Sequence, residues 1–125
     1  MSCNYNQATL AGRLTKNPDL KRISDSTSKL SFILAVNRGY KNETGQTEAD
    51  FIPISLWGKM AEIGNDLLEK GSPVLVWGKI KVRSYEVGEE RKWSTEISAD
   101  NFQLLNRKKI EILNASEMEP ALETE

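Results

Sequence analysis

Apolar and polar residues alternate along most of this chain, a pattern typical of β-strands with one buried face. Five segments show it: residues 5–14, 29–36, 51–57, 74–87 and 91–105. Between the third and the fourth, residues 59–70 carry apolar residues at the spacing of a core-facing helix, with Met60, Ile63 and Leu67 on one stripe. The pattern therefore predicts five strands and one helix.

Turn-forming residues and a long polar stretch divide these segments. Residues 17–19 (Asn-Pro-Asp) predict a turn, and the polar residues 37–49 predict a long hairpin loop. Pro53 has no N–H for a ladder, so its strand should lie at an edge or be bulged there. Gly64, inside the helical segment, predicts close packing at that point.

The order of the elements indicates a fold. Five strands with one helix between strands 3 and 4 is the order of an OB-fold barrel. We therefore expect an all-β protein with one helix, built as a five-stranded OB-fold barrel over residues 1–105.

The third and fourth strands each have two unlike faces. In the third strand, one face is aliphatic, and the other carries Phe51, Pro53, Ser55 and Trp57. In the fourth strand, the apolar face comprises Val74, Val76, Ile80 and Val82, and the opposite face comprises Trp77, Lys79, Lys81, Arg83 and Tyr85. The aliphatic faces are expected in the core, which leaves the aromatic faces outward.

The charge of the chain is unevenly distributed. The 125 residues have a formal net charge of −1, from 17 basic and 18 acidic residues. Residues 114–125 hold four glutamates and no base, so residues 1–113 carry 17 basic against 14 acidic residues, a net charge of +3. We expect residues 106–125 to form a short acidic, disordered tail after the barrel.

Basic residues gather on or beside the strands with outward aromatics. They are Arg13, Lys16, Arg38, Lys41, Lys59, Lys79, Lys81 and Arg83. Cations that follow phosphates, together with rings that stack on bases, are what a single-stranded nucleic acid requires. Other interpretations are a solvated charged face, core aromatics (accepted for Phe32 and Phe102, open for Trp93) or a surface for protein partners.

Several classes of chemistry are disfavoured. The chain has no histidine and one cysteine, which excludes imidazole-based catalysis, an intrachain disulfide and a multi-cysteine zinc site. Both Gly-Lys pairs lack the rest of a phosphate-binding loop. We expect a protein that binds without catalysing, needs no cofactor, and lies in the cytoplasm with the nucleoid, because neither a signal peptide nor a membrane span is recognisable.

Five runs of residues resemble the bacterial single-stranded DNA-binding protein (SSB) family. They are LAGRLTKNPDL (10–20), FILAVNR (32–38), ADFIPISLWGKMAE (49–62), LEKGS (68–72) and residues 78–85, in order within residues 5–105. The resemblance implies an OB-fold protomer of a homotetramer, around which single-stranded DNA wraps. It assigns base stacking to Tyr40, Phe51, Trp57 and Tyr85, of which Tyr40 enters through the resemblance alone. Its basic contacts match Arg13, Lys59, Lys81 and Arg83 most clearly.

Two departures from the family pattern change the expectations. Trp77 stands where a polar residue is common, so it is either an extra stacking platform or an interface residue. The chain ends in acidic residues without the Pro-Phe tip by which family members recruit replication and repair enzymes, which fits a short paralogue or a phage- or plasmid-borne form.

The function expected from the sequence is nonspecific binding and protection of single-stranded DNA during replication, recombination or repair. One alternative is an OB-fold primosomal adaptor that acts mainly through protein partners. A further alternative is a structural oligomer whose aromatic faces are subunit contacts.

Overall fold

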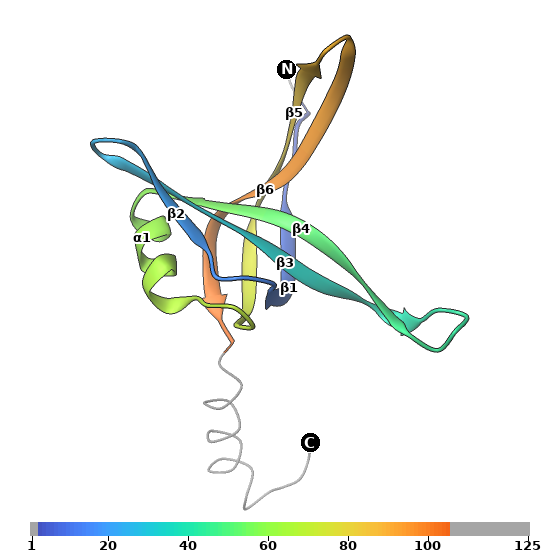
Figure 1. Cartoon of the computed structure of the whole chain (residues 1–125). Helices are drawn as coiled ribbons and strands as arrows, with labels where there is room; N and C mark the ends of the chain where they lie inside the picture. Colours follow the sequence, from blue (N-terminus) through green and yellow to red (C-terminus); the bar gives the residue numbers. More distant parts are fainter. Residues whose placement is uncertain (1–2, 106–125) are drawn as a thin grey trace, which may run out of the picture.

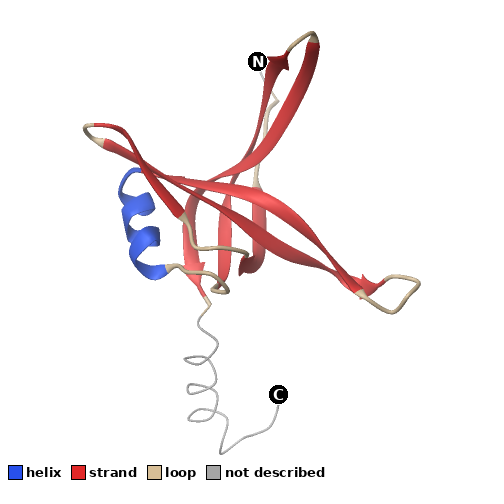
Figure 2. Ribbon diagram, in the orientation of Figure 1, coloured by secondary structure: helices blue, strands red, loops and turns tan. Residues whose placement is uncertain are grey.

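The computed structural model describes residues 3–105, which form six strands and one helix (Figures 1 and 2). The strands are β1 (Ala8–Leu14), β2 (Asp19–Ser24), β3 (Thr27–Lys41), β4 (Thr47–Trp57), β5 (Pro73–Val87) and β6 (Glu90–Leu104). The helix α1 (Gly58–Leu67) lies between β4 and β5. Three long hairpins, β2–β3, β3–β4 and β5–β6, project from the body of the molecule (Figure 1).

Five of the strands close into a barrel. The sheet order is β1-β5-β6-β4-β3-β2, and β1 also pairs with β3, so β1, β5, β6, β4 and β3 form a ring with β2 outside it. Within the described sheet, β4 and β6 pair in parallel and the other pairs are antiparallel. The predicted OB-fold barrel is confirmed, with the helix between the same two segments as expected.

Alternating aliphatic residues fill the barrel, as the pattern predicted. The largest fully buried side chains include Leu30, Leu34, Ile54, Leu56, Val74 and Val76. Helix α1 closes the barrel against β3 and β4, and Gly64 permits its close approach. A Cβ at Gly64 would lie 2.8 Å from Leu30 Cδ2, which confirms the close packing expected there.

The helix is shorter than predicted. It ends at Leu67, because Leu68 turns to an extended conformation and inserts its side chain into the core. Its start is sharp, since Trp57 is still extended and Gly58 has a φ of +63°, which glycine adopts without strain. This turn carries the chain directly from β4 into the helix.

The sequence pattern missed strand residues where side chains are exposed on both faces. It predicted a turn at 17–19 and no strand directly after it, whereas β2 begins at Asp19; the six residues of β2 are all exposed and show no alternation. The loop expected over residues 37–49 is only residues 42–46, because β3 and β4 continue as a polar two-stranded hairpin beyond the barrel. A strand without a buried face carries no hydrophobic periodicity.

The expected core face of β5 is correct only in its first half. Val74 and Val76 are buried, but Ile80 is 44% and Val82 57% exposed. A register shift between Trp77 and Gly78 marks the point where β5 and β6 leave the barrel as a free hairpin. The same faces continue along it, but no core lies beneath them.

Pro53 occupies a local edge, as its missing N–H requires. β4 pairs with β6 only over Ile54 and Ser55 in the described sheet, so Pro53 lies one residue before that short ladder. Its pairing with Ile33 of β3 continues in register. The alternative of a bulge at this position is wrong.

Candidate nucleic-acid interface

The side of β3 and β4 opposite the aliphatic core carries Phe51 and Trp57, and we call it the platform. Ser55, between the two rings, is buried. The cross-strand pairs of the platform run in register, from Lys29 with Trp57, through Ser31 with Ser55 and Ile33 with Pro53, to Ala35 with Phe51. Phe51 is 65% exposed, and Trp57 at the other end is half-buried. Strand alternation therefore places both rings outward, on the face opposite the aliphatic core.

Trp57 is held at the platform end by a cation. Lys29 Nζ lies 5.1 Å from the centroid of the Trp57 ring, a cation–π arrangement. The indole Nε1 of Trp57 is buried and has no hydrogen-bond partner among the described residues. Lys29 was not among the candidates from the sequence, because only the β3–β4 register reveals that it faces Trp57.

A groove of about 200 Å³ lies beside the platform. Its floor includes Ile33 and Pro53, and its walls include Lys16 and Asp19 from the β1–β2 region and Glu96 from β6. Its apolar lining is suited to a flat base, whereas its one cation, Lys16, is accompanied by two carboxylates, Asp19 and Glu96. Lys16, expected near phosphates, thus lies beside the platform.

The β5–β6 hairpin carries the second part of the surface. Alternation along β5 puts Lys79, Lys81, Arg83 and Tyr85 on one face, and Tyr85 is 47% exposed. This basic face is connected to the platform through Glu96. Glu96 Oε2 accepts a hydrogen bond of 3.2 Å from Ser55 Oγ and lies 3.9 Å from Arg83 Nη2.

Arg13 also borders the platform. It pairs with Ala35, which in turn pairs with Phe51, so these residues form one row across β1, β3 and β4. Its Nη1 donates a 3.0 Å hydrogen bond to the carbonyl of Gly71. Lys59 is exposed on α1, two residues after Trp57.

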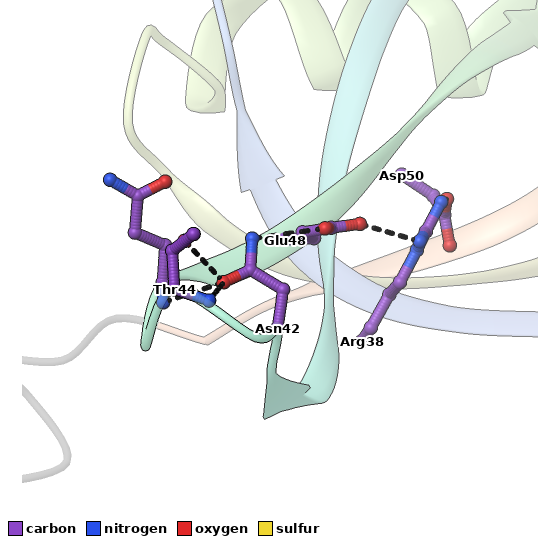
Figure 3. Close-up of polar contacts among 6 residues, drawn as sticks. Arg38, Asn42, Thr44, Glu48 and Asp50 are labelled. Atoms are coloured by element: carbon purple, nitrogen blue, oxygen red, sulfur yellow. Dashed lines mark hydrogen bonds and ion pairs between the residues drawn. The ribbon is translucent and has the colours of Figure 1, made fainter.

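The β3–β4 hairpin holds Arg38, Tyr40 and Lys41. Tyr40 and Lys41 are exposed. Arg38, in contrast, donates to two carboxylates, with Nη1 2.7 Å from Glu48 and both Nε and Nη2 bonded to Asp50 (Figure 3). The hydrogen bond to Asp50, with the charges of both carboxylates, raises the pKa of Arg38.

Trp77 lies apart from the platform. It lines a separate hollow of about 470 Å³ together with Tyr5, Lys79 and Asp100, where the N-terminal segment crosses β5. Asn6 fixes that segment, because its side chain exchanges two hydrogen bonds with the backbone of Ile80. Trp77 thus lines a different hollow from Ile33 and Pro53, on the face of β5 that also carries Lys79 and Tyr85. Trp93, exposed, lies on the hairpin face opposite Tyr85.

The described residues contain neither a cluster of metal ligands nor a membrane-spanning helix. Among residues 3–105, no three His, Cys, Asp or Glu side chains gather in a way that could hold a metal ion. No helix within that range is long and apolar enough to cross a membrane.

An OB-fold barrel with exposed rings and cations on its β3–β4 face and adjoining hairpin belongs to the class of oligonucleotide-binding barrels. The sequence matches the Single-strand binding protein family over residues 5–105. With most of its length matched, the chain belongs to this family.

Named relatives agree with this assignment. The chain is 42% identical over 106 residues to single-stranded DNA-binding protein 1 of Clostridium acetobutylicum, covering 83% of this chain and 96% of the relative. It is 43% identical over 105 residues to single-stranded DNA-binding protein B of Bacillus subtilis, covering 83% and 93%.

A solved structure shows the same fold. A deletion mutant of the single-stranded DNA binding protein from Thermus aquaticus superposes with a TM-score of 0.68 and 31% sequence identity. The match covers 83% of this chain and 52% of the other, so the present chain corresponds to about half of that protein.

Proposed function

We propose that this protein binds single-stranded DNA without sequence preference and shields it during replication, recombination or repair. The observation that carries the proposal is the placement of aromatic rings and cations on the outer sides of adjoining strands. Exposed Phe51 and half-buried Trp57 lie on the platform, and Glu96 links the platform to the cationic face of the β5–β6 hairpin. Family membership and the names of the relatives support it.

Base stacking is the proposed role of the outward rings. Every base has a π-face, so stacking on aromatic side chains accepts any sequence, whereas a duplex hides those faces. The rings proposed for it are Tyr40, Phe51, Trp57 and Tyr85, with Trp77 as an additional stacking ring. Trp77 lies in a different hollow, so a strand reaching it must leave the platform along β5.

Phosphate contact is the proposed role of the cations. They are Arg13, Lys16, Lys41, Lys59, Lys79, Lys81 and Arg83. The sequence adds Arg38 to this set, but its two carboxylate partners favour a positioning role for it. Contacts of this kind release counterions from the strand, so affinity should fall as salt rises, with a slope of about −0.7 per phosphate neutralised.

Assembly and location are part of the same proposal. We infer a homotetramer in the cytoplasm, associated with the nucleoid, in which residues 1–105 bind DNA and residues 106–125 form an acidic tail. The function is binding and not catalysis. The primosomal-adaptor alternative is not favoured, because the named relatives are single-stranded DNA-binding proteins.

Fluorescence anisotropy of a labelled oligo-dT tests the proposal. The full chain is titrated into the labelled strand at several salt concentrations, with the same label on a duplex of equal length as control. We expect tight binding to the single strand that weakens with salt and much weaker binding to the duplex. Equal affinity for the two forms, or no binding at low salt, would refute the proposed function.

A further inference from the structure

The β3–β4 hairpin has an irregular strand pairing at Tyr40, one of the rings proposed to stack on bases. The register shifts between Asn37, which pairs with Ala49, and Lys41, which pairs with Thr47. Three residues of β3, including Tyr40, therefore lie in a bulge without regular ladder partners, and Gly39 has a φ of +89° there. A bulge of this kind re-aims side chains but also interrupts the hydrogen bonds that stiffen a hairpin.

Side-chain bonds span the bulge in place of the interrupted ladder. Arg38, at the start of the bulge, bonds to Asp50 through Nε at 3.1 Å and Nη2 at 2.9 Å. Its Nη1 bonds to Glu48 at 2.7 Å (Figure 3). One planar guanidinium thus ties β3 to two successive positions on one side of β4, the side that carries Ile52 and Ile54 in the barrel and lies opposite Phe51. Lysine cannot reproduce this geometry.

The chain of bonds continues to the hairpin tip. The second oxygen of Glu48 accepts a 3.1 Å hydrogen bond from Asn42 Nδ2. Asn42 Oδ1 in turn accepts hydrogen bonds from the backbone N–H groups of Thr44 and Gln46, and from Thr44 Oγ1. A continuous network therefore runs from Asp50 through Arg38 and Glu48 to the loop (Figure 3). The register shift that holds Tyr40 lies within the same stretch of the hairpin.

We propose that Arg38, Glu48 and Asp50 form a brace that fixes the orientation of Tyr40 for stacking, and that Arg38 is a positioning residue and not a phosphate contact. The inference rests on the proposed function, since it assigns a part in single-strand binding. Two carboxylates on one arginine leave this cluster with a net negative charge, which is opposite to what a phosphate requires. Their presence on a DNA-binding hairpin is explained if their purpose is to hold Arg38.

If the brace exists, neutralising one of its carboxylates should weaken DNA binding and not strengthen it. Removing a negative charge from a DNA-binding surface normally strengthens binding, but Asp50→Asn and Glu48→Gln should each weaken oligo-dT binding about three- to tenfold, because they loosen the hairpin. Glu43→Gln is the matched control. It removes the same charge from the same hairpin, and Glu43 makes no ion pair within residues 3–105, so affinity should stay constant or rise slightly.

Two further measurements separate positioning from general destabilisation. In a Tyr40→Ala background, Asp50→Asn should have almost no additional effect, because the brace acts through Tyr40; independent sites would instead add. The salt slope of Asp50→Asn should equal that of the wild type, because no phosphate contact is gained or lost. Arg38→Lys should weaken binding like Asp50→Asn, although it keeps the positive charge.

Binding of the wild-type protein to oligo-dT is measured first and decides whether the proposed function holds. The results that would overturn the brace are different ones. Stronger binding and a steeper salt slope for Asp50→Asn would show that the carboxylates merely compete with phosphate for Arg38, and would overturn the proposal. Additive effects of Asp50→Asn and Tyr40→Ala would overturn it equally. Circular dichroism confirms folding, and Glu48→Gln provides the same test if Asp50→Asn does not fold.

Discussion

Substitution of Trp57 by phenylalanine and by alanine should separate base stacking from folding. The ring lies on the platform, half-buried, with Lys29 Nζ 5.1 Å from its centroid. Its Nε1 is buried without a partner in the described part of the chain. Phenylalanine keeps an aromatic face and removes the N–H, whereas alanine removes both.

The magnitudes follow from these two features. Loss of one stacked base costs about 1–3 kcal/mol, so Trp57→Ala should weaken oligo-dT binding about five- to 150-fold. An unpaired buried donor costs about 1–3 kcal/mol, and its removal in Trp57→Phe should offset the smaller ring, leaving the free energy of unfolding within about 1 kcal/mol of the wild type. Most of the affinity should remain in Trp57→Phe.

Urea denaturation gives the free energy of unfolding of each variant, and anisotropy of a labelled oligo-dT gives its affinity. The stacking assignment would be refuted by a folded Trp57→Ala protein with wild-type affinity. Equal loss of affinity in both variants would show that the platform needs the indole itself and not simply an aromatic face.

Three further outcomes are expected. Lys81→Ala should weaken binding and lower the salt slope by about 0.7, whereas Arg22→Ala, on the outlying β2, should leave the slope unchanged in the same anisotropy titration. Gly12→Ala should destabilise the barrel by about 1–3 kcal/mol or more, measured as a lower thermal midpoint, because its Cβ would collide with the backbone oxygen of Ala35; a midpoint equal to that of the wild type would contradict this packing. A chain ending at residue 105 should bind oligo-dT at least as tightly as the full chain, and a large loss of affinity would show that residues 106–125 contribute to binding.

The sequence predicted strands and their faces correctly where one side of the strand is buried, because burial on one side imposes a two-residue hydrophobic period. The aliphatic and aromatic sides of β4 were separated correctly, because Ile54 and Leu56 face a real core and leave Phe51 and Trp57 outward. The same reasoning failed at Ile80 and Val82, where the apolar face continues past the end of the barrel. Hydrophobic patterning shows which residues share a face, but not where the core beneath that face ends.

Side-chain contacts between neighbouring strands could not be predicted from the sequence. Arg38 was expected among the phosphate ligands because of its charge and place, but it bonds to two carboxylates of β4, and the β3–β4 register that brings them to it has no pattern in the sequence. The Lys29–Trp57 contact depends on the same strand pairing. Neither register nor bulge position follows from one chain's hydrophobic periodicity in a segment exposed on both sides.

Tryptophan fluorescence during titration with oligo-dT tests the central claim most directly. A Trp77→Phe, Trp93→Phe protein keeps Trp57 as its only indole, because the chain has three tryptophans. At low salt we expect saturable quenching as bases stack on Trp57, reversed by added salt. Unchanged emission from this protein, while anisotropy shows that the strand is bound, would place the DNA elsewhere and contradict the account.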